Sequence, residues 1–156
     1  MSSLVADRHT TMSVVQRETT EGYAAANGVQ MYWRSVGEGG TPLVVVHGGF
    51  GLADAFDDFA AQLAGGRRVV AVELQGHGRT PDIDRPFTCE AFGDDLAALI
   101  GELGLGQADL FGYSLGAEAS LRAAIQHPDR VRRLVSVSAA FRRDGWFRRC
   151  STAWRT

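Results

Sequence analysis

The sequence has 156 residues, of which 45% are hydrophobic and 22% charged, so it fits one globular domain with a sizeable core. Its formal net charge of −2 gives no overall field favouring nucleic acid or an acidic membrane, and Cys89 and Cys150 form neither a disulfide framework nor a zinc pattern. The sequence has no apolar run of signal-peptide or transmembrane length, which predicts a cytoplasmic protein without a membrane partner.

The chain begins with a polar, aperiodic segment over residues 1–20, which we expect to be a loose leader. Residues 21–37 then contain Asn27-Gly28, a pair that favours a tight hairpin turn because both positions tolerate a positive φ. Two short antiparallel strands are therefore predicted on either side of this turn.

From residue 42 onward, strand and helix patterns alternate. Continuous apolar runs predict four strands, at PLVVVH (42–47), RRVVAVEL (67–74), ADLFGYS (108–114) and RLVSVSAAF (133–141). Helical spacing predicts three helices between them, marked by Phe56, Phe59, Ala60 and Leu63, by Phe92, Leu96, Leu99 and Leu103 after the N-cap Thr88, and by Leu121 and Ile125 before His127-Pro128.

This alternation predicts the α/β fold class, namely a three-layer αβα arrangement in which helices cover both faces of a mostly parallel sheet, with a β-hairpin at the N-terminus. In such sheets ligands bind at the carboxyl ends of the strands. Three glycine-containing loops are expected at those ends, with the sequences HGGFG, QGHGRT and GYSLG.

Residues 112–116 have the form G-x-S-x-G and join a predicted strand to a predicted helix, which is the context of a nucleophile elbow. Flanking glycines relieve crowding at so sharp a turn and leave the hydroxyl of Ser114 exposed. The helix N-terminus there stabilises developing negative charge. The alternative interpretation is a serine that caps the helix between two packing glycines.

An acyl-transfer site also needs two N–H donors aimed at the oxygen of its tetrahedral intermediate. The N–H of Leu115 can supply one, and Gly49 is the first candidate for the other, with Phe50 nearby. Gly48 and Gly49 let the backbone approach a substrate closely. We expect His47 to hold this loop in place rather than to act as a base. On its own, HGGFG is only a glycine-rich turn.

The order HGG, ELQGHGRT, GYSLG and HPDRVRRLVSVSAA, over residues 25–146, resembles the α/β-hydrolase superfamily. The resemblance implies a cofactor-independent, metal-free serine hydrolase of esterase, lactonase or perhydrolase type, acting on a small ester-like molecule. It implies Ser114 as nucleophile, and residues 21–146 as the N-terminal part of the domain. Gln75 and Thr80 depart from the family's usual D-x-x-G-x-G-x-S, and His77 in this loop is normally not catalytic.

The family's triad follows the order Ser, acidic residue, His. His127 is the only histidine after Ser114, and thirteen helical residues place it about 20 Å away, so no catalytic histidine is predicted in this chain. Asp144 follows the fourth strand, where some relatives carry the acid. A surface-loop aspartate is the alternative.

Residues 147–156 lack the helical periodicity with which the family would continue. Restoring one base before codons for RRCSTAWRT gives PEVLDGMAN, an amphipathic continuation. We therefore interpret this tail as frameshifted, with the last strands and helices missing and the chain weakly active or inactive. Such a loss would expose the fourth strand as a sheet edge and uncover apolar helix faces.

Two other functions compete with hydrolysis. In the first, Gly49-Phe50-Gly51 and Glu73 would begin a dinucleotide-binding module, although the charge of Asp54 opposes a pyrophosphate there. In the second, the folded fragment would bind or scaffold without catalysis, which the missing base leaves open.

Overall fold

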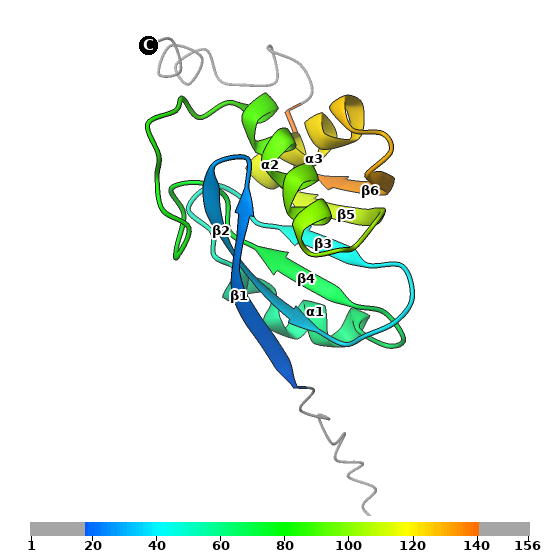
Figure 1. The fold of residues 1–156 in the computed structure, drawn as a ribbon. Helices are drawn as coiled ribbons and strands as arrows, with labels where there is room; N and C mark the ends of the chain where they lie inside the picture. Colours follow the sequence, from blue (N-terminus) through cyan, green and yellow to red (C-terminus); the bar gives the residue numbers. More distant parts are fainter. Residues whose placement is uncertain (1–17, 141–156) are drawn as a thin grey trace, which may run out of the picture.

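An antiparallel hairpin opens the part of the chain that the computed structural model describes, residues 18–140 (Figure 1). Strands β1 (Thr19–Ala26) and β2 (Val29–Val36) pair along their whole length. Asn27 (φ 49°) and Gly28 (φ 87°) both adopt a positive φ in the turn, which confirms the predicted hairpin. Strand β1 begins two residues before the predicted segment and so includes the last two residues of the predicted leader (1–20), whose residues 1–17 lie outside the described residues.

The remaining strands are β3 (Leu43–Val46), β4 (Val69–Val72), β5 (Ala108–Tyr113) and β6 (Val131–Val137), and together with the hairpin they form one six-stranded sheet. Its order is β1-β2-β4-β3-β5-β6, with β2 antiparallel to β4 and the last four strands parallel to one another. Because β4 and β5 lie on opposite sides of β3, the winding reverses there, which is the point where sheets of this kind bind ligands at their carboxyl ends.

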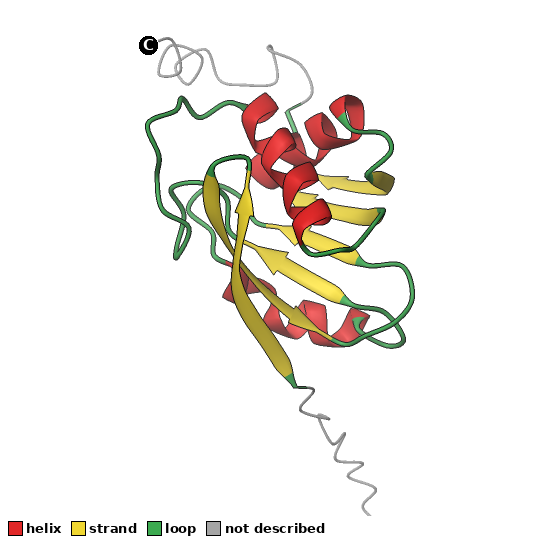
Figure 2. Ribbon diagram, in the orientation of Figure 1, coloured by secondary structure: helices red, strands yellow, loops and turns green. Residues whose placement is uncertain are grey.

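Helices cover both faces of this sheet, which confirms the three-layer αβα prediction (Figure 2). The short 3-10 helix η1 (Ala53–Phe56) and helix α1 (Asp57–Leu63) lie on one face. Helices α2 (Cys89–Glu102) and α3 (Leu115–Gln126) lie on the other. The side chain of Thr88 accepts a hydrogen bond from the N–H of Ala91 (3.0 Å), so it caps α2 as predicted.

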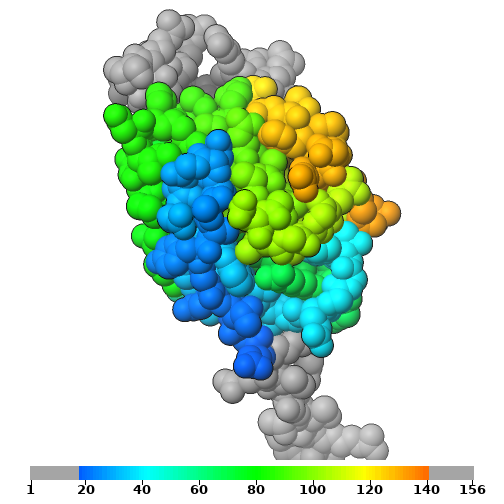
Figure 3. Space-filling model, viewed as in Figure 1, coloured from blue at the N-terminus to red at the C-terminus, as the bar shows by residue number. Residues whose placement is uncertain are grey.

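The core divides between the two faces because neighbouring strand residues point in opposite directions. Val44 packs with Leu96 of α2, whereas Val45 packs with Ala60 of α1. Every residue of β3 and β4 is buried, which explains their uninterrupted apolar sequences. The hairpin lies against α2 (Figure 3), and most of its buried hydrophobic residues belong to the larger of these two hydrophobic clusters, the one that contains Val44 and Leu96.

Helix α3 differs from the prediction in the face that it buries. Small residues make the contact, namely Gly116, Ala117, Ala119, Ser120 and Ala123. Ile125, predicted as a face marker, is 60% exposed, and Leu121 is only partly buried. Small residues let the helix approach the sheet closely, so packing distance rather than apolar bulk decides which face turns inward.

Strand β6 forms one edge of the sheet. The side chains of Val135 (54% exposed) and Val137 (37% exposed) face solvent, so this edge exposes apolar as well as charged side chains. No helix of residues 18–140 combines the length and apolar character needed to cross a membrane.

Candidate active site

Three loops follow the carboxyl ends of β3, β5 and β4, namely residues 47–51, residues 112–116 and residues 73–80. Because β3 pairs in parallel with both β4 and β5, these loops lie beside one another at one end of the sheet. The structure therefore brings together the three segments that the sequence singled out.

Ser114 forms the turn between the last residue of β5 and the first of α3, with φ 52° and ψ −116°. A non-glycine residue at positive φ is strained by roughly 1–2 kcal/mol. Its N–H donates to the carbonyl of Val137 (2.9 Å), and its carbonyl accepts from Ala117 N–H (2.9 Å). Its side chain makes no capping bond and is partly exposed, so the helix-capping interpretation is wrong.

The glycines around the serine are required by close packing. A Cβ placed on Gly112 would lie 2.6 Å from the Cα of Ala117, and one on Gly116 would lie 2.7 Å from the carbonyl carbon of Val46. A Cβ on Gly48 would lie 3.2 Å from that of Ser114. The first loop therefore lies directly against the turn that carries the hydroxyl.

Some backbone N–H groups near Ser114, in the first loop and at the start of α3, make no hydrogen bond within the described residues. In the first loop, Gly51 N–H donates to Gly48 O (3.0 Å) and closes a tight turn in which Phe50 has φ 61°. The N–H groups of Gly49, Phe50 and Leu115 have no acceptor among the described residues. Free donors next to a strained serine are the arrangement that an oxyanion site requires.

His47 joins the first loop to the second. Its Nδ1 lies 2.7 Å from Gly48 O, and its Nε2 accepts from the N–H of Leu74 (3.1 Å). These two bonds assign the neutral tautomer with the proton on Nδ1. Burial lowers the pKa of this imidazole, which favours the same neutral form. Both ring nitrogens are therefore engaged in holding the loops, as the sequence analysis expected.

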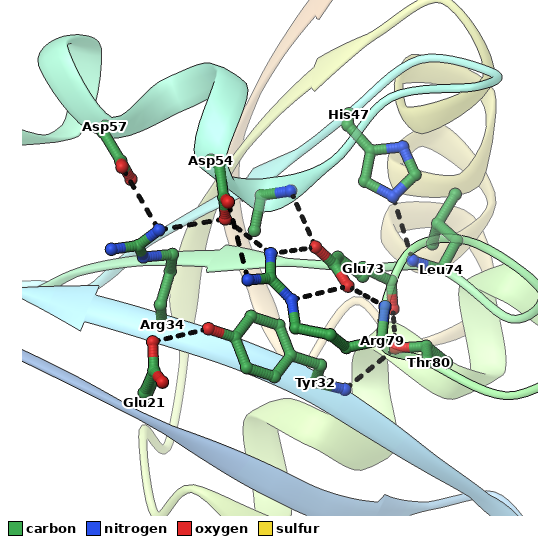
Figure 4. Close-up of polar contacts among 11 residues, drawn as sticks. Glu21, Tyr32, Arg34, His47, Asp54, Asp57, Glu73, Leu74, Arg79 and Thr80 are labelled. Atoms are coloured by element: carbon green, nitrogen blue, oxygen red, sulfur yellow. Dashed lines mark hydrogen bonds and ion pairs between the residues drawn. The ribbon is translucent and has the colours of Figure 1, made fainter.

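Glu73, directly after β4, is the centre of a polar cluster beneath these loops (Figure 4). Its carboxylate is fully buried and accepts from Ala53 N–H (3.2 Å), from Arg79 N–H (2.5 Å) and from the Arg79 guanidinium (2.5 Å). Burial opposes ionisation of Glu73, but the hydrogen bonds from Arg79 and Ala53 outweigh it and hold the pKa of the carboxyl below its usual value.

The guanidinium of Arg79 extends this cluster to Asp54 of η1 (2.5 Å) and lies over the ring of Tyr32, 3.9 Å from its centroid. Sequence reasoning missed this role of Arg79 and considered Glu73 only as a ribose ligand. A carboxylate fully engaged by Arg79 and by the N–H of Ala53 is not free to bind a ribose. The signal that could have identified it is a charged residue ending a strand that is otherwise wholly apolar.

The two residues that depart from the family pattern in the second loop are buried and hydrogen-bonded. The hydroxyl of Thr80 accepts from Tyr32 N–H (2.9 Å) and donates to Glu73 O (2.8 Å). The amide oxygen of Gln75 accepts from Arg85 Nε (2.9 Å). Both residues therefore fix the shape of the loop.

No imidazole nitrogen is hydrogen-bonded to the Ser114 hydroxyl among residues 18–140. His77 directs Nδ1 to Gln75 O (3.0 Å), and His127 pairs with Asp94 (2.8 Å) at the far end of α3. Asp144, the candidate acid, lies outside the described residues. Within residues 18–140, no three His, Cys, Asp or Glu side chains gather where they could hold a metal ion.

Comparison with known proteins agrees with this geometry. The family model described as the alpha/beta hydrolase fold matches residues 41–153. The chain belongs to this family. A segment of 99 residues is 36% identical to the sn-1-specific diacylglycerol lipase ABHD11 of Danio rerio, covering 62% of this chain and 31% of that protein. Another of 99 residues is 39% identical to a methyl ester esterase of pimeloyl-acyl-carrier protein from Neisseria meningitidis, covering 64% and 36%.

Solved structures of other hydrolases also match this chain. The epoxide hydrolase VrEH1 of Vigna radiata matches with a TM-score of 0.70 and 27% identity, over 75% of this chain and 39% of that one. The naproxen esterase of Bacillus subtilis matches with a TM-score of 0.74 and 21% identity, over 81% and 45%, a likeness of fold alone. The chain spans about a third of the length of these curated α/β-hydrolase relatives.

Proposed function

We propose that this α/β hydrolase acts on small ester-like substrates, with Ser114 as nucleophile and the N–H groups of Gly49 and Leu115 as oxyanion donors. The observation that carries the proposal is the pairing of a serine held at positive φ with N–H groups that have no acceptor among residues 18–140. Phe50 N–H, one residue further along the loop, is the alternative second donor.

In the proposed reaction, the hydroxyl oxygen of Ser114 attacks the ester carbonyl carbon while a base removes its proton. The carbonyl electron pair moves onto oxygen, where the two N–H groups and the N-terminus of α3 stabilise the charge. Collapse of this intermediate expels the alcohol, which takes up a proton, and leaves an acyl-serine. Water then attacks the acyl-serine in the same way and releases the acid.

No side chain among residues 18–140 is positioned to act as this base, and no catalytic histidine is predicted in this chain. Both nitrogens of His47 hold loops, and His127 is paired at the opposite end of α3. Without a base an alcohol is a poor nucleophile, although oxyanion donors alone still give weak catalysis. We therefore expect slow ester turnover by this 156-residue chain.

A fluorophosphonate probe tests the nucleophile independently of turnover. We expect slow labelling that Ser114→Ala abolishes, whereas Ser138→Ala leaves it unchanged. Ser138 is a matched control because it also follows a strand with positive φ (59°) and is exposed, but it begins no helix. Labelling that survives Ser114→Ala would refute the assignment of Ser114, and a complete absence of labelling would favour the non-catalytic binding role.

Turnover of p-nitrophenyl acetate tests the expectation that this chain hydrolyses esters only slowly. A kcat near the enzyme median of about 10 s⁻¹, lost in Ser114→Ala, would show that the chain carries a complete catalytic site and would contradict the expectation of slow turnover.

A further inference from the structure

The chain leaves β6 beside the turn that carries Ser114. The N–H of Ser114 donates to the carbonyl of Val137, the last residue of β6 (2.9 Å). Ser138, which follows directly, has φ 59°, so the backbone changes direction as soon as the strand ends. The strained backbone of Ser114 is therefore bonded to a segment that is itself strained, and other contacts must hold that segment in place.

Glu118 makes such a contact from the first turn of α3. It lies one helical turn after Ser114, and its N–H donates to Ser114 O (3.2 Å). Its carboxylate Oε1 accepts a hydrogen bond from the N–H of Ala140 (3.2 Å). The segment that follows β6 is thus joined to the start of α3 at two points, through Val137 O and through Ala140 N–H.

The other carboxylate oxygen of Glu118 is occupied as well. Oε2 accepts from the thiol of Cys89, the first residue of α2 (3.4 Å). Burial, followed by the hydrogen bond to Glu118, raises the pKa of this thiol to about 12, so the thiol keeps its proton and remains a donor. Because both oxygens of the carboxylate accept, the bond to α2 helps to orient the oxygen that binds Ala140.

A simpler role for Glu118 would be to offset the dipole of α3, since an acidic residue in the first turn stabilises a helix by its charge alone. Glu90 shows that simpler arrangement in the first turn of α2, where its exposed carboxylate pairs with Arg122 on the surface (2.9 Å). Glu118 differs, because it is partly buried and both of its oxygens bind other segments of the chain. Such contacts depend on the length of the side chain as well as on its charge.

We propose that Glu118 is a positioning residue that holds the end of β6 against the serine turn and thereby keeps the N–H groups around Ser114 in the geometry of an oxyanion site. The inference rests on the proposed function, in which Ser114 and the N–H of Leu115 act together on the substrate. Release of Ala140 would let Val137 move away and would deprive Ser114 N–H of its acceptor. The loss of one hydrogen bond to a carboxylate should make this segment open about ten times more often.

Two conservative variants of the full chain separate the length of this side chain from its charge. Glu118→Asp keeps the charge but is one CH₂ group shorter, whereas Glu118→Gln keeps the length and an acceptor oxygen but loses the charge. Amide hydrogen exchange followed by NMR should be about tenfold faster at Ser114 and Ala140 in Glu118→Asp, and within about twofold of the parent chain in Glu118→Gln. Glu90→Asp is the matched control and should change neither amide.

Labelling of Ser114 by the fluorophosphonate probe gives the functional readout. Its rate should fall about tenfold in Glu118→Asp and stay within about twofold of the parent chain in Glu118→Gln. Unchanged exchange at Ser114 in Glu118→Asp, or a larger effect of Glu118→Gln than of Glu118→Asp, would overturn the proposal in favour of the dipole role. Faster exchange with an unchanged labelling rate would also overturn it, because Glu118 would then act on the fold alone. A parent chain in which Ser114 is not labelled contradicts the proposed function instead, and the exchange rates still decide whether Glu118 holds the end of β6.

Discussion

Replacing Gly116 by alanine measures how closely α3 approaches β3. The new Cβ would lie 2.7 Å from the carbonyl carbon of Val46 and would also meet the carbonyl oxygens of Val46 and His47. These are backbone atoms, which cannot rotate away. We expect overpacking near the upper end of its usual range, about 3 kcal/mol. Alanine gains at most about 1 kcal/mol in helix propensity, so the free energy of unfolding should fall by about 2 kcal/mol.

Urea unfolding followed by circular dichroism measures this loss, with Gly101→Ala as the matched control. Gly101 lies in α2, and a Cβ there would have its nearest neighbour 3.9 Å away in the side chain of Arg130. This control should gain up to about 1 kcal/mol from helix propensity alone. If Gly116→Ala stabilised the chain as Gly101→Ala does, the argument that α3 is packed against the end of β3 would be refuted. The m-value should not change in either variant.

Three further predictions concern the loops. Burial lowers the pKa of His47, so the unfolded state takes up a proton first and the free energy of unfolding should fall as the pH drops below about 6.5. Thermal unfolding between pH 5 and 8 should show this fall. A dependence of Tm on pH that is the same in His47→Gln would contradict the prediction. The pKa of Glu73 is held low, so its contribution to the free energy of unfolding is present above about pH 4.3 and is lost as the pH falls through the pKa of the folded state. Acid unfolding followed by circular dichroism should therefore depend less steeply on pH in Glu73→Gln. Equal steepness in the two proteins would count against the ion pair. Phe50→Gly removes backbone strain, and differential scanning fluorimetry should show a Tm higher by about 2 °C, whereas a lower Tm would show that the Phe50 ring stabilises the fold.

The order of strands and helices was predictable because its signals are local. Strands β3 and β4 are buried on both faces, so each is a short, continuous apolar run that can be recognised without knowing its neighbours. The hairpin was predictable from Asn27-Gly28, since few other pairs accept two consecutive positive φ values.

The contact face of α3 could not be predicted in the same way. Leu121 and Ile125 have the spacing of a buried face, yet the helix turns its smallest residues to the sheet. That choice depends on the distance between Gly116 and Val46, which are far apart in the sequence. A periodicity of apolar residues contains no information on such a distance.

The candidate site was predictable in its loops and only partly in its chemistry. G-x-S-x-G between a strand and a helix identified the turn at Ser114, but whether N–H groups remain free depends on every hydrogen bond around it. The partnership of Glu73 and Arg79 was also hidden, because the same carboxylate at a strand end fits a ribose ligand equally well by sequence alone.

Two strained residues and two buried anchors explain why this end of the sheet keeps its shape. Ser114 and Phe50 both adopt positive φ without stabilising contacts from their own side chains. Strain of this kind persists only where surrounding contacts fix the backbone. His47 supplies them by joining the first loop to Leu74, and Glu73 does so by joining η1 to Arg79. None of these contacts involves an imidazole at the serine, so the backbone geometry around Ser114 is held independently of any base.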